Sequence, residues 1–170
     1  MNPRLTTLVT LIGLCALYRL LPHPWNVSPV AAMALFAGAH FANRWLALLV
    51  PLAAMALSDL LLGLHATLPF VYGALMLTTL VGMRLGEKWS VTGLALASVG
   101  SSVLFFFVTN SAVWLLGNYY PPGWQGLNQA LVAGLPFFQH SLLGDLLFSA
   151  ALFGGFALLS RQFPALRPAQ

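Results

Sequence analysis

The chain has 170 residues, of which 59% are hydrophobic and only 6% are charged. Soluble domains carry about 25% charged residues, so this composition excludes an ordinary soluble protein and predicts an integral membrane protein. The seven Lys and Arg residues are scattered, which excludes the basic face of a nucleic-acid-binding protein. The single cysteine, Cys15, excludes an intrachain disulfide and a cysteine-based zinc site.

Long apolar blocks follow one another along the chain, without the alternating ten-residue segments of a membrane barrel. We expect one integral membrane domain over residues 1–170, an all-α bundle of six transmembrane helices. The spans are expected at about 5–21, 28–42, 45–64, 69–86, 92–116 and 136–160. Because the last apolar stretch is too long for one span, residues 124–135 are expected to form a separate interfacial or re-entrant segment. Pro136 suits the first turn of the sixth span.

The basic residues predict the orientation of the bundle. Six alternating spans leave only Arg19 on one side, and they place the other six on the opposite side: Arg4, Arg44, Arg84, Lys88, Arg161 and Arg167. Because Lys and Arg concentrate in cytoplasmic loops, both termini are expected in the cytoplasm. The predicted location is the bacterial inner membrane, crossed several times.

Small residues recur at four-residue spacing on three of the spans. This spacing lets helix backbones approach closely in lipid, so it predicts packing within the bundle, with homodimerisation through one of these faces as the alternative. The residues are Ala34, Gly38 and Ala42 on the second span, Gly93, Ala97 and Ser101 on the fifth, and Ala150 and Gly154 with Ala151 and Gly155 on the sixth.

Polar residues within the spans fall almost entirely in the outer half of the predicted bundle. Asp59, for example, lies about 8 Å from the outer end of the third span, at 1.5 Å per residue. Because intramembrane polar groups usually face a cavity or one another, we regard these residues as candidate ligand-binding residues. They are Asn26, Asp59, His65, Tyr72, Asn110, Trp114, His140 and Asp145.

Two interpretations of these residues remain open. In the first they line a pocket, where Asp59 and Asp145 bind polar ligand atoms or hold loops and the rings of Tyr72 and Trp114 stack on the ligand. In the second they only stabilise the bundle: Arg19 pairs with Asp59 or Asp145, and Asn110 bonds a backbone carbonyl. A cavity among these residues would favour the first interpretation, and a filled outer half would favour the second.

Sequence motifs of enzymes are missing. The chain contains no HExxH, GxSxG or Walker-type glycine loop, and no two histidines are spaced i, i+4. We therefore predict no catalytic residue, no metal site and no cofactor. His65 is interpreted as an interfacial histidine, with ligation of a metal centre inside a bound cofactor as the alternative.

Several segments resemble known membrane proteins. "PHPWNVSPVAAMALFAGAHF", "PLAAMALSDLLLG", "FFFVTNSAVWL" and "GLPFFQHSLLGDLLFSAALFG" resemble, nearly end to end, an uncharacterised bacterial family of small integral membrane proteins. More loosely, "SPVAAMALFAG" followed by "SDLLLG" is similar to the second and third spans of the S components of energy-coupling-factor (ECF-type) vitamin transporters. That resemblance implies six spans, a short second span and an outer pocket for a vitamin-like ligand. The first span lacks the Ala-x-x-x-Ala face that many S components use to dock their coupling subunit.

These observations predict a protein that binds and takes up a small vitamin-like or cofactor-precursor nutrient from the outer face. Its expected partners are the small-molecule ligand, the lipid bilayer and, as a further candidate, an energising transporter module. The first alternative is a non-catalytic structural or assembly subunit of a membrane complex. The second is an intramembrane enzyme, which would need Asp59 and Asp145, or His140 and one of them, to meet at a common point.

Overall fold

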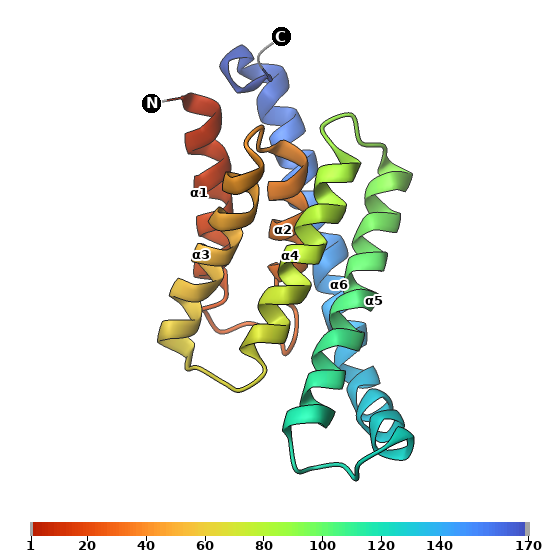
Figure 1. Cartoon of the computed structure of the whole chain (residues 1–170). Coiled ribbons are helices and arrows are strands. Elements are labelled where there is room, and N and C mark those ends of the chain that lie inside the picture. The colour runs from red at the N-terminus through yellow and green to blue at the C-terminus, as the bar shows by residue number, and fades with distance from the viewer. Residues whose placement is uncertain (1, 169–170) are drawn as a thin grey trace.

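The computed structural model describes residues 2–168, and within that range every regular element is a helix (Figure 1). The elements are α1 (Pro3–Tyr18), α2 (Val30–His40), α3 (Arg44–Leu62), α4 (Leu68–Leu85), α5 (Val91–Leu116), α6 (Trp124–Gln162) and the short 3₁₀ helix η1 (Pro164–Leu166). The prediction of an all-α chain with six α-helices is confirmed. Local caps explain several boundaries: the side chains of Asn2, Asn43 and Ser90 accept hydrogen bonds from the first turns of α1, α3 and α5.

The helices run alternately up and down, so both termini lie at the same end of the bundle (Figure 1). We name this end the Arg4 end, after the first basic residue of α1. Arg44 begins α3, and Arg84 and Arg161 lie in the last turns of α4 and α6, so these basic residues also lie at the Arg4 end. The opposite end, named the Arg19 end, carries the connections 19–29, 63–67 and 117–123.

The outer surface of the bundle is apolar. Leu57, Leu61 and Leu96 are 65%, 74% and 69% exposed, as are many other large hydrophobic residues. Exposed apolar surface on this scale needs a hydrocarbon environment. Four helices, α3 to α6, are long and apolar enough to cross a membrane, whereas α1 and α2 are shorter. The chain therefore has the structure of a helical membrane protein.

Helix α2 forms the core of the bundle. All eleven of its residues are buried, and it contacts each of the other five long helices. A helix that is hydrophobic on every side is expected in this position. Its 11 residues extend about 16 Å, roughly half the thickness of a bilayer's hydrocarbon core. The predicted span 28–42 is therefore too long: α2 begins only after Pro29 and ends before the extended residue Phe41.

The closest helix contact in the bundle joins α2 to α4. A Cβ atom added to Gly38 would overlap the carbonyl oxygen of Thr79, and one added to Gly82 would overlap the carbonyl oxygen of Leu35. The predicted packing role of Gly38 is confirmed. Gly154 and Gly155 on α6 have no heavy atom within 4 Å of such a Cβ, so the same prediction for the sixth span is wrong for these two glycines.

Helix α6 is one continuous helix of 39 residues that contains Pro136. The expected break before Pro136, with residues 124–135 as a separate segment, is not observed. Proline removes one backbone hydrogen bond but leaves the rest of a long helix in place, which membrane helices tolerate where neighbouring groups compensate.

Candidate functional site

The molecule has hollows of two kinds. One is a groove of about 630 Å³ between α1 and α3, and nearly all of its surface is apolar. Two smaller cavities at the Arg19 end are lined by polar side chains, including several of the predicted candidates. These two cavities have the mixed lining that small-molecule sites usually have.

The first of them, which we name the loop cavity, has a volume of about 290 Å³. It lies beside the first turn of α2, where the connection 19–29 meets α3, α4, α5 and α6. Its polar lining residues are Arg19, His23, Asn26, Ser28, His65, Ser141 and Asp145. A surface hollow shares Arg19, His23, Asn26 and Leu62 with it, so the cavity adjoins the surface at the Arg19 end.

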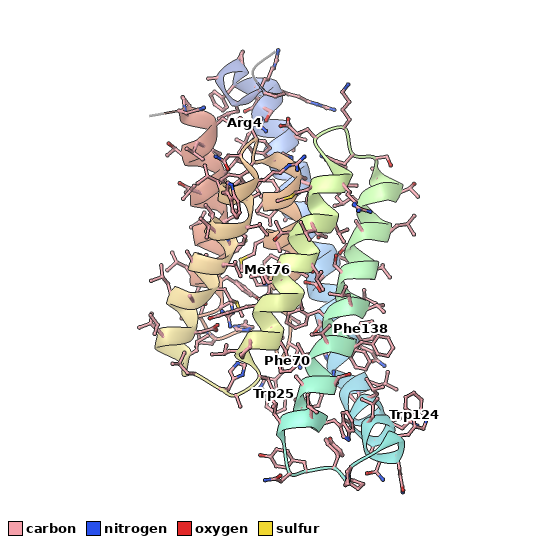
Figure 2. All side chains as sticks on the ribbon, viewed as in Figure 1. Arg4, Trp25, Phe70, Met76, Trp124 and Phe138 are labelled. Atoms are coloured by element: carbon pink, nitrogen blue, oxygen red, sulfur yellow. The ribbon has the colours of Figure 1, made fainter. Side chains whose placement is uncertain are left out.

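The second cavity, which we name the phenylalanine cavity, has a volume of about 200 Å³ between α5 and α6. It is lined by Phe105, Phe106, Phe137 and Phe138, together with polar groups that include Thr109 and Asn110. Figure 2 shows Phe138 in the part of the bundle nearer the Arg19 end, beside α5. Four residues, Asn26, Phe105, Ser141 and Asp145, line both cavities, so the two adjoin.

Asp59 forms an ion pair behind the loop cavity. Arg19 Nη2 donates to Asp59 Oδ1 at 2.9 Å, and the Tyr72 hydroxyl donates to Asp59 Oδ2 at 2.9 Å. The other guanidinium nitrogen, Nη1, donates to Ser58 Oγ. The pairing of Arg19 with Asp59 that the structural interpretation expected is therefore found. Asp59 and Tyr72 position Arg19, which itself lines the cavity.

Asp145 is bound by a different set of groups. The Ser102 hydroxyl donates to its Oδ2 at 2.7 Å, and the backbone N–H groups of Ala31 and Ala32 also donate to its carboxylate. These two amides belong to the first turn of α2, whose own N-cap residue, Pro29, supplies no side-chain hydrogen bond. Asp145 therefore caps α2 from another helix, and its charge interacts favourably with the positive end of the α2 dipole.

Four of the eight predicted residues line the two cavities. His65 lines the loop cavity, Asn110 lines the phenylalanine cavity, and Asn26 and Asp145 line both. Asn26 has a left-handed backbone conformation, with φ of 59°, which asparagine tolerates better than most residues. The amide of Asn110 donates to Phe106 O at 2.8 Å, as the structural interpretation expected, and no donor within residues 2–168 bonds its Oδ1, which can accept.

Trp114 and His140 line neither cavity. Trp114 Nε1 donates to Pro121 O at 3.1 Å and so holds the connection after α5, while His140 Nδ1 donates to Pro136 O at 3.0 Å within α6. His140 is exposed on the side of its helix. Neither side chain lines a cavity as predicted. Instead, one ring nitrogen of each residue donates to a nearby backbone carbonyl.

Sequence reasoning missed several residues of the site. Arg19 was considered only as a partner of the carboxylates, and Ser28, Ser102, Ser141 and Phe105 were not singled out. The buried Ser28 Oγ has no hydrogen-bond partner within residues 2–168, and its residue lines the loop cavity. Serine and phenylalanine are common in membrane helices, so only the fold distinguishes those that line a cavity. Over the same residues, no three His, Cys, Asp or Glu side chains are grouped closely enough to hold a metal ion.

The fold and these cavities define a helical membrane protein with a polar, partly enclosed site at one end of its bundle. The comparison with protein families gives a more specific assignment: residues 1–166 match the family of unknown function DUF6580. The chain belongs to this family. No curated protein and no solved structure matches the chain.

Proposed function

We propose that this protein binds a small organic nutrient in the two adjoining cavities and takes part in its uptake across the bacterial inner membrane. The observation that carries the proposal is the pair of cavities at the Arg19 end, of about 290 and 200 Å³, with Asn26 and Asp145 in both linings. Small-molecule sites occupy about 300–1,000 Å³, a range that the two cavities reach together.

The direction of access follows from the charges. Six of the seven basic residues belong to the side opposite Arg19, and that side faces the cytoplasm under the positive-inside rule. The loop cavity then faces the outside, and a ligand enters it through the surface hollow beside Pro22 and Trp25 (Figure 2). The short α2, the long outer connection before it and the outer site are similar to the plan of ECF S components, which supports a vitamin-like or cofactor-precursor ligand and an energising module as partner.

A structural role in a membrane complex is the second candidate, and one observation favours it. Asp59, Arg19 and Tyr72 satisfy one another inside the chain. An intramembrane enzyme has less support, because Asp59 lines neither cavity and so does not meet Asp145 at a common open point.

Mass spectrometry of ligands that co-purify with the protein tests the proposal. We expect the wild-type protein to retain a small organic molecule, and both Asn26→Gly and Asn110→Ala to lose most of it. Asn26→Gly keeps the left-handed backbone conformation accessible and removes only the side chain. His140→Ala is the matched control, because His140 is exposed and lines neither cavity.

Size-exclusion chromatography of each variant shows that loss of ligand does not reflect unfolding. Retention of the same molecule by Asn26→Gly and Asn110→Ala, or equal loss from His140→Ala, would contradict the proposed site. A wild-type protein that carries no ligand and instead co-purifies with a membrane complex would support the structural role.

A further inference from the structure

The charges of the site indicate which class of ligand it takes. The chain has three acidic residues, and two of them are paired with arginine. Asp59 pairs with Arg19 at 2.9 Å, and Glu87 pairs with Arg4 at 2.7 Å. The third, Asp145, forms no ion pair with any cationic side chain of residues 2–168. It is also 95% buried, with a relative exposure of 5%.

The groups that bind Asp145 compensate only part of a full negative charge. They are one hydroxyl and two backbone amides at the start of α2. A helix N-terminus carries the equivalent of about half a positive charge. Buried carboxylates in membrane helices are normally paired, and they mark functional sites where they are not. Asp145 faces the loop cavity and the phenylalanine cavity, so a bound molecule can supply the missing charge.

Arg19 does not make the loop cavity attractive to anions. Its guanidinium is already neutralised by Asp59, at 2.9 Å, and held by Ser58. With Asp145 ionised and His23 and His65 neutral, the side chains around the loop cavity leave one negative charge without a cationic partner. A site with this balance favours a cation over an anion.

The phenylalanine cavity suits the body of such a cation. Phe105, Phe106, Phe137 and Phe138 line it, and the rings of Phe106 and Phe138 lie 5.0 Å apart. The faces of aromatic rings attract cations, most strongly where water is excluded. The cavity of about 200 Å³ also has room for one aromatic ring, since about 150 Å³ suffices for benzene in a protein core.

We propose that the ligand is a small organic cation, an amine or a cationic nitrogen heterocycle, whose charged nitrogen pairs with Asp145 and whose ring lies among the phenylalanines. This inference rests on the proposed binding function and names the ligand class of that same site. Asn110, whose Oδ1 accepts, and Ser141 then bind the polar substituents of the ring.

Equilibrium dialysis of the full chain in detergent micelles against three probes of similar size tests the ligand class. The probes are 2-phenylethylamine, which is cationic, 2-phenylethanol, which is neutral, and 3-phenylpropanoate, which is anionic. We expect the amine to bind about tenfold more tightly than the alcohol, a ratio that corresponds to about 1.4 kcal/mol, and the anion to bind most weakly.

Asp145→Asn tests the residue that sets this preference. Asparagine caps helices about as well as aspartate, so α2 keeps an acceptor while the charge is lost. We expect the amine-to-alcohol ratio to fall to about one in this variant, since only the charge term is removed. Glu87→Gln removes the same charge at the Arg4 end and is expected to keep the ratio.

The possible outcomes separate this inference from the function on which it rests. Tighter binding of the alcohol or the anion by the wild-type protein overturns the cationic ligand and leaves the binding function standing. A ratio unchanged in folded Asp145→Asn overturns the role of Asp145. Absence of binding of all three probes, in a protein that also co-purifies with no small molecule, overturns both the ligand class and the binding function.

Discussion

Asp59 shows how one residue joins three helices at the Arg19 end. It lies on α3, and its two carboxylate oxygens accept from Arg19 after α1 and from Tyr72 on α4. Two hydrogen bonds link the three side chains, and Arg19 is the member that also lines the loop cavity. The bundle itself therefore fixes the position of the Arg19 guanidinium at this end of the loop cavity.

Asp59→Asn is expected to destabilise the protein by about 3–5 kcal/mol, because it leaves the mostly buried Arg19 guanidinium without a counter-charge. Tyr72→Phe removes one hydrogen bond and is expected to cost only about 1 kcal/mol. Thermal unfolding in detergent micelles, followed by tryptophan fluorescence, compares the two variants. The double variant Arg19→Met with Asp59→Leu should be more stable than Asp59→Asn alone. Equal losses for Asp59→Asn and Tyr72→Phe would show that water, not Asp59, compensates the Arg19 charge.

The two aspartates differ in how far their surroundings could be predicted from the sequence. Arg19 and Asp59 are oppositely charged and end successive down-running helices, so their pairing was one of the considered arrangements. The partners of Asp145 are the Ser102 hydroxyl and the backbone amides of Ala31 and Ala32. Every residue but proline has such an amide, so no residue type identifies which of them a distant carboxylate binds.

At the scale of elements, α2 is bound by opposite charges at its two ends. Asp145 accepts hydrogen bonds from its first turn, and Arg4 Nη2 donates to the carbonyl oxygen of His40, its last residue, at 2.9 Å. Each charge has the sign that the adjacent end of the helix dipole favours. Because α2 begins and ends within the bundle, these side chains satisfy backbone groups at its termini that have no partner within the helix.

Gly38→Ala is expected to be strongly destabilising, because its Cβ would lie 2.7 Å from the backbone nitrogen of Met83 on α4 and closer still to a backbone carbonyl. Overpacking of this kind costs about 1–3 kcal/mol or more, since backbone atoms must move. Gly73→Ala on α4 is the matched control, because nothing lies within 4 Å of the new Cβ. Thermal unfolding should show a large loss for the first variant and little change for the second. A similar midpoint for both would mean that α2 and α4 can separate freely.

Helix boundaries were predicted well where caps and apolar length agree, and poorly where tertiary contacts decide. The third, fourth and fifth spans differ from α3, α4 and α5 by at most two residues at either end. Residues 124–135 were misjudged because the length of an apolar stretch and a proline at 136 both favour a break. In the structure Gly134 lies directly against the Asn110 side chain on α5, and this contact lies within the segment where the break was expected.

Arg4 acts at the scale of the whole molecule, because it joins four separate segments at one end of the bundle (Figure 2). From α1 it donates to the carbonyl of Leu166 at 2.7 Å, to that of His40, and to Glu87 in the connection between α4 and α5. Its guanidinium also lies 5.4 Å from the centre of the Phe156 ring on α6.

Arg4→Gln is accordingly expected to destabilise the protein more than Glu87→Gln. The first change removes hydrogen bonds from a charged donor to two carbonyls, each worth about 1.5–3 kcal/mol. The second removes a partly exposed ion pair, and such pairs contribute about 0–1 kcal/mol. Unfolding midpoints in the same detergent measure both. A lower unfolding midpoint for Glu87→Gln than for Arg4→Gln would indicate that the ion pair, and not the carbonyl contacts, contributes more to the stability of the Arg4 end.

The orientation of the whole bundle can be measured on a single helix. Gln125 and Gln162 are both exposed and lie at opposite ends of α6, whose 39 residues extend about 58 Å, well beyond the roughly 30 Å of a hydrocarbon core. In a Cys15→Ala background, where no other thiol is present, we expect a membrane-impermeant maleimide to label Gln125→Cys in intact cells. Gln162→Cys should be labelled only after the cells are permeabilised, because the basic residues predict a cytoplasmic location for its end. The opposite pattern would place the two cavities on the cytoplasmic side, and labelling of both in intact cells would mean that α6 does not cross the membrane.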